Sequence, residues 1–395
     1  MVRQTGGAPL ILIALLGSTL LPAACGDGGG ADRAMRSDSA GVEIVRSPGV
    51  DRPLTWTFEK VIDLGGEVDG GLEFHRVHDT SVDTDAAGLI YVLDAGNYRI
   101  TVLDRAGEVV RTMGGQGGGP GEMSFPTDMA VGDDGMAAVW DFGVGGFLRY
   151  APDGTPLPVV KFIGALQREL AVVPGRIAGV FNLPRTESVD SVQSRLLAIG
   201  EADTLVLAGR NEPTPQVVSF DCMGLSIPPY LSPGIAWAAR GDRVVARTTA
   251  EYAVDVYDGG RPVASWRRDI PVVSATIEHA IAEAPSDSFR MVSAAGRCAV
   301  STREAVEQIG WAAFVPLVQD IHMARDGMTW VRRRTTVPGE FRIDVLNADG
   351  EYAGTLPAAA PWPAAFRGVD EIVTVETDDL DLPHVIVYRI NRAAS

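Results

Sequence analysis

The sequence predicts an all-β fold, a six-bladed β-propeller with four-stranded blades. Three observations support this prediction. Short β-type segments follow one another with Gly-containing turns between them, the turn residues recur after 47 residues, and no amphipathic helical pattern dominates the 395 residues. A repeat of ~40–50 residues with four strands is typical of propeller blades, because a single four-stranded sheet cannot cover both its faces.

The first complete repeat unit spans residues 79–112. Its strand candidates are the segments 79–85, 89–93, 99–103 and 108–112. The turns between them contain Gly88, Asn97 and Gly107, and Gly adopts positive φ without steric cost, whereas Asn and Asp hydrogen-bond to their own backbone. We therefore expect four antiparallel strands joined by tight turns. The aspartates Asp83, Asp85, Asp94, Asp104, Asp133, Asp134 and Asp141 are interpreted as formers of such turns.

The repeat continues along the chain. Gly88 and Gly135, and likewise Asp94 and Asp141, are separated by 47 residues. Further units are expected at 128–162, 176–208, 235–266, 319–356 and 365–390. The last unit shows only three strand candidates, and an unpaired sheet edge promotes aggregation. One of the two N-terminal segments, 41–45 or 56–64, is therefore expected to supply the fourth strand and close the ring.

One segment departs from the strand pattern. Residues 274–311 are rich in Ala, Glu and Ile at helical spacing, and Ser301 or Thr302 followed by Glu304 is a helix-start signal. The sequence therefore predicts a short helical insertion between blades four and five.

The N-terminus has the features of a targeting segment. Residues 1–24 contain Arg3, an apolar run and two alanines before Cys25, as in a bacterial lipoprotein signal in which Cys25 is lipidated. Plain secretion and a retained anchor are the alternatives. We expect residues 25–40 to be a flexible tether and residues 41–392 to be the propeller, held at the cell envelope on the outer-membrane or periplasmic side.

The charge of the chain excludes one class of partner. Its net charge is −17, and so acidic a protein repels the phosphates of nucleic acids. We expect a monomer whose partners are the membrane, through a lipid anchor, and an unidentified protein or small-molecule ligand.

The run from Asp94 to Pro126 resembles an NHL-type repeat of bacterial six-bladed β-propeller lipoproteins. The resemblance rests on Asp94-Ala-Gly-Asn-Tyr-Arg-Ile100, Val102-Leu-Asp104 and the Gly-Pro-Gly-Glu loop that ends at Glu122. That family includes binding propellers and relatives of lactonases and lyases. The resemblance implies a ligand- or protein-binding module, with a metal-dependent lactonase-like or lyase-like enzyme of the central channel as the alternative.

Two pairs of side chains are candidates for the ligand face. His75 and His78 have a spacing that could bind a metal if the backbone is turned, and the alternative is a pair of surface histidines. Arg332 and Arg334 precede an enlarged loop and could form an anion pocket, or could pair with acidic neighbours. No cofactor is predicted, and calcium or zinc remains an alternative. Common catalytic motifs are missing from the sequence, so catalytic residues stay unassigned.

The three cysteines divide into two roles. Besides Cys25, the chain contains Cys222 and Cys298, in the segments that enter and leave blade four. In an oxidising compartment these two could form a disulfide, and two buried free thiols are the alternative.

Overall fold

The computed structural model describes residues 33–66, 72–183, 191–213, 215, 217–220, 224–284, 288–293 and 296–392. The fold described below is that of the unit Ala34–Ser395. Cys25 and the expected signal segment lie outside the described residues. No helix in the described ranges is both long and apolar enough to cross a membrane.

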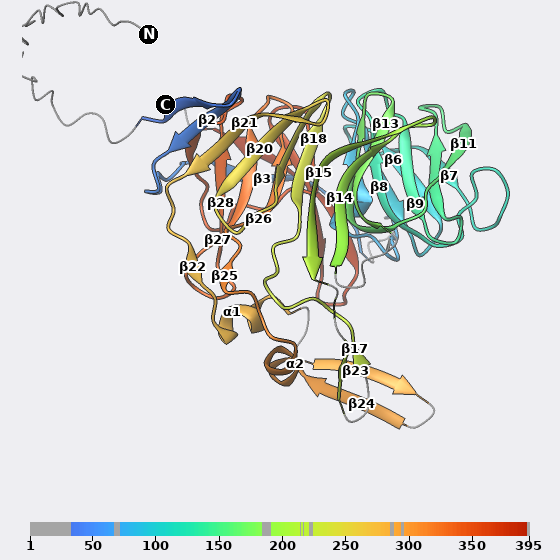
Figure 1. The fold of residues 1–395 in the computed structure, drawn as a ribbon. Coiled ribbons are helices and arrows are strands. Elements are labelled where there is room, and N and C mark those ends of the chain that lie inside the picture. The colour runs from blue at the N-terminus through green and yellow to red at the C-terminus, as the bar shows by residue number, and fades with distance from the viewer. Residues whose placement is uncertain are drawn as a thin grey trace, which may run out of the picture. The chain divides into compact units, whose positions relative to one another are not determined.

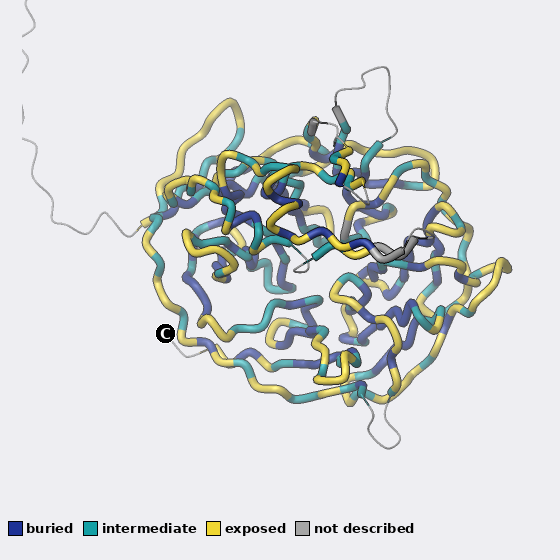
Figure 2. Tube along the Cα trace, turned by 90° about the horizontal axis from the view of Figure 1, so that it is seen from below, coloured by how far each residue is buried: buried dark blue, intermediate teal, exposed yellow. Residues whose placement is uncertain are grey.

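The described chain forms a six-bladed β-propeller, which confirms the predicted fold (Figures 1 and 2). Five blades are four-stranded sheets, and blade four is the core of a six-stranded sheet. The blade strands are β4 (Val82–Thr84), β5 (Ile90–Asp94), β6 (Arg99–Leu103) and β7 (Val109–Gly114) in blade one; β8 (Pro126–Val131), β9 (Ala137–Asp141), β10 (Gly146–Tyr150) and β11 (Pro156–Lys161) in blade two; β12 (Ala165–Val173), β13 (Arg176–Leu183), β14 (Ser191–Ile199) and β15 (Thr204–Pro213) in blade three; β18 (Ala236–Arg240), β19 (Arg243–Arg247), β20 (Ala253–Asp258) and β21 (Arg261–Arg268) in blade four; β26 (Val318–Met323), β27 (Thr329–Arg334), β28 (Phe341–Leu346) and β29 (Tyr352–Thr355) in blade five; and β30 (Ala365–Arg367), β31 (Glu371–Thr377) and β32 (Pro383–Asn391) in blade six.

An N-terminal strand closes the ring, as predicted. β3 (Thr57–Gly65) pairs antiparallel with β32 and is the outer strand of blade six. The two ends of the propeller thus meet in one sheet, and the outer edge of β32 is covered by β3.

The other N-terminal segment has a different position. β1 (Met35–Ser39) and β2 (Val42–Ser47) form a hairpin, and β2 pairs parallel with β21 at the outer edge of blade four. Residues 35–39 were expected to belong to the tether, but they form an edge strand. All five residues are exposed, so no apolar alternation marks this strand in the sequence.

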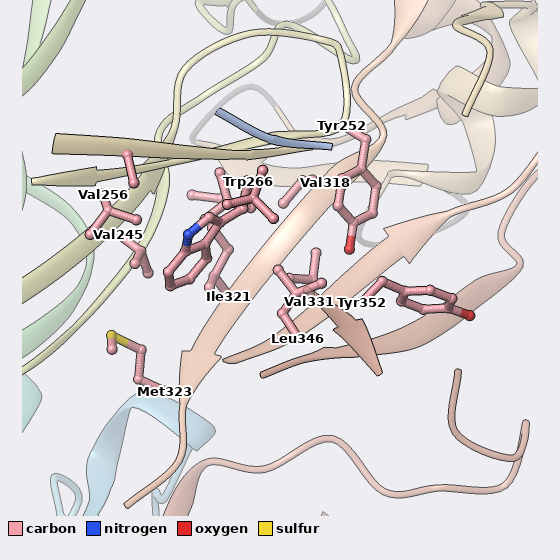
Figure 3. Close-up of a cluster of buried hydrophobic side chains, with 14 of the residues drawn as sticks. Val245, Tyr252, Val256, Trp266, Val318, Ile321, Met323, Val331, Leu346 and Tyr352 are labelled. Atoms are coloured by element: carbon pink, nitrogen blue, oxygen red, sulfur yellow. The ribbon is translucent and has the colours of Figure 1, made fainter. Parts of the chain in front are cut away.

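The core lies between neighbouring blades. One cluster, drawn in Figure 3, joins Val245 and Trp266 of blade four to Ile321, Val331 and Leu346 of blade five. Each of these side chains is at most 3% exposed. Burial of one such side chain contributes roughly 1.5–3 kcal/mol, so this cluster stabilises the contact between blades four and five.

Two aspartates at equivalent positions anchor the connections between blades. Asp94 and Asp141 end the second strands of blades one and two and are fully buried. Asp94 accepts hydrogen bonds from the backbone N–H groups of His75 and Arg76, and Asp141 accepts them from Ser124 and Phe125. Each carboxylate therefore fixes the segment that enters its own blade.

The insertion between blades four and five contains two short helices, as predicted, and also strands. In order it comprises β22 (Val273–Ser274), α1 (Ile277–Ala282), β23 (Ser288–Ser293), β24 (Gly296–Ser301), α2 (Thr302–Ile309) and β25 (Phe314–Val315). Ser301 caps α2 by accepting a hydrogen bond from the Glu304 N–H group, which confirms the helix-start signal. The insertion projects from one side of the ring, near the small pair β16 (Val218–Ser219) and β17 (Gly224–Leu225) (Figure 1).

Candidate functional site

The first strands of the six blades surround a central channel with a cavity of about 440 Å³. All six of these strands, β4, β8, β12, β18, β26 and β30, contribute residues to its wall. Apolar side chains in the wall include Met129, Trp237, Ile321, Met323 and Phe366. The channel has a connection end, where the segments between blades enter, and a turn end, where the first strands pass into tight turns.

Asp83 of β4 is a partly buried carboxylate of this wall. Its Oδ2 accepts a hydrogen bond of 2.8 Å from the Val131 N–H group of blade two, and its Oδ1 accepts one of 2.7 Å from Thr84. Desolvation raises the pKa of Asp83, whereas these two hydrogen bonds act in the opposite direction. The sequence suggested only a turn aspartate, but the carboxylate faces the cavity.

Three residues form a charged bridge at the turn end. One oxygen of Asp133, Oδ1, accepts hydrogen bonds from Arg325 at 2.6 Å and from Arg240 at 3.3 Å. Arg325 also donates to the carbonyl oxygens of Thr84 and Phe366, and Arg240 donates to that of Met323. The charged bridge therefore joins blades one, two, four, five and six around the end of the channel.

His322 of β26 also lines the cavity. Its ring packs edge-on against Trp362, with 4.9 Å between the centroids. His322 precedes the turn glycine Gly327 by five residues, as Asp83 precedes Gly88, so the two residues are equivalent in their blades. This equivalence was the one sequence signal that could have identified both as channel residues.

Blade three contributes a strained position to the wall. Glu169 has φ of +57°, which is uncommon for a residue with a Cβ, and it lies where β12 loses register with β13. The irregularity is a β-bulge, a feature often found beside functional sites. It also explains why the first strand of blade three has no clear alternation in the sequence.

The structure places His75 and His78 near the connection end. Both are exposed. His78 lines a second cavity of about 450 Å³ together with Arg76, Asp79 and Phe125. The two histidines are part of no cluster of three or more metal-ligating side chains in the described ranges. Their role as ligand-face residues stays a prediction.

The arginines of β27 differ in their partners. Arg334 forms two hydrogen bonds with Glu283, and Arg333, which lies between the two candidates, pairs with the buried Asp344. Arg332 stacks over Phe341, 4.5 Å from the ring centroid, and burial lowers its pKa. Within the described chain Arg332 has no ion pair closer than 4 Å, so it remains the candidate of this group for contact with an anion.

Of the two cysteines expected to pair, only Cys298 is described. It lies in β24, is buried, and is disulfide-bonded. Cys222 lies outside the described residues, so the identity of the pair stays a prediction. Mass mapping of the unreduced protein tests it.

No group of three or more His, Cys, Asp or Glu side chains among the described residues is arranged to hold a metal ion. Metal analysis of the purified protein tests whether calcium or zinc is bound.

No protein-family model matches the chain, and no curated protein matches it. Among solved structures, it is similar to a candidate exported protein from Bacteroides fragilis, with 12% identity, a TM-score of 0.49, and coverage of 89% of this chain and 99% of the other.

Two further structures are similar in the same way. A member of the duf4221 family from Bacteroides vulgatus has 10% identity and a TM-score of 0.48, with coverage of 86% and 99%. A catalytically inactive virginiamycin B lyase from Staphylococcus aureus, with quinupristin, has 10% identity and a TM-score of 0.37, with coverage of 84% and 99%. At these values the similarities carry no argument about function.

Proposed function

We propose that this protein is an envelope-tethered binding module that holds a small molecule in its central channel. The observation that carries the proposal is the convergence of Asp83, Asp133, Arg240 and His322, from four different blades, on one cavity of about 440 Å³. Cavities of roughly 300–1,000 Å³ with apolar walls and a few polar groups are typical small-molecule sites.

The two kinds of wall residue have different roles in this proposal. Partly exposed apolar side chains of the wall, such as Leu170 and Val172, favour transfer of an apolar body from water. The charged groups fix its orientation, because a buried polar group without a partner costs free energy. The connections at the opposite end, with His78 and Arg332, are candidates for contact with a ligand that extends further or with a partner protein.

The binding test uses methionine methyl groups as reporters. Met129, Met136 and Met323 line the cavity, whereas Met113 is buried elsewhere, between blades one and two. A ligand in the channel should shift the first three methyl resonances and leave Met113 unchanged. Ala239→Phe fills the cavity and should abolish binding, whereas Ala106→Phe adds the same ring on an exposed turn and should not. Equal binding by both variants would refute the channel site.

The anchoring part of the proposal rests on Cys25. Labelled palmitate should be incorporated into the wild type and not into Cys25→Ser, which should leave the membrane fraction. Absence of label in the wild type would point to plain secretion or to a retained anchor.

One observation favours the rival function, a lactonase-like or lyase-like enzyme. Asp83 and His322 supply a carboxyl group and an imidazole to the same cavity, and such groups can transfer protons. Metal analysis distinguishes the binding module, for which no cofactor is predicted, from the metal-dependent enzyme. Stoichiometric calcium or zinc in the purified protein would favour the metal-dependent enzyme.

A further inference from the structure

We infer that the channel selects ligands with a small organic ammonium group on an apolar body, and that Asp83 receives the ammonium group. This inference rests on the proposed function, because it requires that the channel binds a small molecule. Three observations support it: the partners of Asp83, the partners of the neighbouring arginines, and the charge of the wall.

Among the described residues, Asp83 accepts hydrogen bonds from two backbone N–H groups alone, those of Thr84 and Val131. Within the described ranges it forms no salt bridge, although it is desolvated in the wall of the cavity. A carboxylate oxygen has two acceptor sites, so each Asp83 oxygen retains one. An ammonium group, with three N–H donors, would supply both the missing countercharge and the missing donors.

The neighbouring arginines are already engaged. Arg240 and Arg325 both bond to Asp133, and each also donates to a backbone carbonyl oxygen. Neither lies within 4 Å of the Asp83 carboxylate, and they influence it only at longer range. Within the charged bridge, the carboxylate of Asp133 offsets part of the charge of the two arginines. Neither arginine therefore serves as the countercharge of Asp83, and a ligand can take that position.

The charge of the wall favours a cation over an anion. Five carboxylate residues line the cavity, from blades one, two and three, against one lining arginine, Arg240. The five are Asp79, Asp83, Asp133, Asp134 and Glu169. The two arginines of the charged bridge offset Asp133 and Asp134 at the turn end, so the remaining negative charge lies toward the connection end, where an anion would pass Asp79 and a cation would be attracted.

Trp237 and Phe366, each 3% exposed, are also among the residues that line the cavity. An aromatic face attracts a cation and also contacts an apolar body, so both parts of an amphiphilic amine find complementary groups. A fully apolar ligand would leave Asp83 desolvated and without a countercharge, which is why we infer the ammonium class.

The test compares three probes with one body and different heads: benzylamine, benzyl alcohol and benzoate. Each is titrated into the full-length mature protein, and binding is followed by calorimetry and by the methyl resonances of Met129 and Met323. We expect benzylamine to bind at least tenfold more tightly than benzyl alcohol, and benzoate to bind more weakly than the alcohol.

The matched variants are Asp83→Asn and Asp153→Asn. Asp83→Asn should reduce benzylamine binding to the level of benzyl alcohol and change alcohol binding less than twofold. Asp153 lies in an exposed turn of blade two, outside the cavity, so Asp153→Asn should change neither. The ranking of the three probes on the wild type supports or refutes the inference even if Asp83→Asn fails to fold.

The outcomes separate the inference from the proposed function. Equal affinity for amine and alcohol, or tighter binding of benzoate, would overturn the ammonium assignment and leave the channel as a binding site. An unchanged benzylamine affinity in a folded Asp83→Asn would also overturn it. If the methyl resonances of Met129 and Met323 respond to none of the three probes at millimolar concentration, the result would contradict both the ammonium assignment and the proposed binding site in the channel.

Discussion

Arg334 and Glu283 form an ion pair with two hydrogen bonds, Nε to Oε1 at 2.6 Å and Nη2 to Oε2 at 2.7 Å. Arg334 ends β27 of blade five, and Glu283 is the C-cap residue of α1 in the insertion. Both side chains are less than one-fifth exposed. The pair therefore fastens the insertion to the enlarged loop of blade five.

Arg334→Ala should loosen the insertion without opening the ring. Loss of a charge-assisted pair of this geometry costs about 2 kcal/mol, because Glu283 is left partly buried without its partner. Hydrogen exchange should accelerate in α1 and stay unchanged in β5. Arg342→Ala is the control, because Arg342 is 47% exposed. Equal exchange of α1 in both variants would contradict this role of Arg334.

His384 should make the closure of the ring dependent on pH. Its Nδ1 lies 2.7 Å from Asp63 Oδ1, so the pair joins β32 to the closing strand β3, and Asp378 lies 3.5 Å from Nε2. The hydrogen bond to Asp63 raises the pKa of His384. The protonated form is thus favoured in the folded state, and its stabilisation is fully present below pH 6.5 and lost as pH rises through the raised pKa.

The measurement is the free energy of unfolding in urea at pH 5.5 and at pH 8.5. The wild type should lose up to about 1 kcal/mol more than His384→Gln between the two values, since Asp63 is 40% exposed and solvent weakens the pair. His75→Gln should behave as the wild type does, because His75 is exposed and makes no comparable pair. Identical pH dependence in the wild type and His384→Gln would contradict the prediction.

The two N-terminal elements should differ in their importance for stability. A chain that starts at residue 48 lacks only the hairpin β1–β2, so it should still melt cooperatively. A chain that starts at residue 66 also lacks β3, which exposes the edge of β32 with its buried Val385 and Val387. The second truncation should aggregate or lose its cooperative melt. Calorimetry and light scattering would refute this if both chains stay monomeric and melt alike.

The fold was largely predictable because its signals are local. Gly88 and Gly135 adopt φ of +83° and +85° in tight turns, so turn chemistry and the 47-residue spacing are visible in the sequence. The first strand of blade three was not predicted, since the bulge around Glu169 interrupts its alternation. The parallel pairing of β2 with β21 was also missed, because β21 lies far along the chain and no local signal specifies a distant partner.

The site was much less predictable than the fold. Asp133 contacts Arg240 and Arg325, which are 107 and 192 residues away in the chain, so only ring closure brings them together. The candidates that the sequence offered for the ligand face, such as His78, lie near the connection end, whereas the charged bridge lies at the turn end. Asp83 and Asp133 have the sequence context of turn aspartates, which conceals the position of Asp83 in the channel wall.

The charged bridge should contribute to stability in a salt-dependent manner. Asp133→Asn keeps an oxygen that can accept hydrogen bonds but removes the negative charge between Arg240 and Arg325. The electrostatic repulsion between the two arginines is then no longer offset by the Asp133 carboxylate. We expect a loss of about 1 kcal/mol in the free energy of unfolding at low salt. The loss should shrink as ionic strength rises, because Asp133 is 56% exposed.

The neighbouring residue offers the control for this prediction. Asp134 is also in the turn, but its carboxylate accepts a hydrogen bond from the Met136 N–H group and contacts no arginine among the described residues. Asp134→Asn should therefore change the unfolding free energy little, since Asn forms the same kind of turn. In Arg240→Gln, which lacks one partner of Asp133, the additional effect of Asp133→Asn should be smaller than in the wild type. Equal losses in both backgrounds would mean that Asp133 stabilises its own turn and not the junction of the blades.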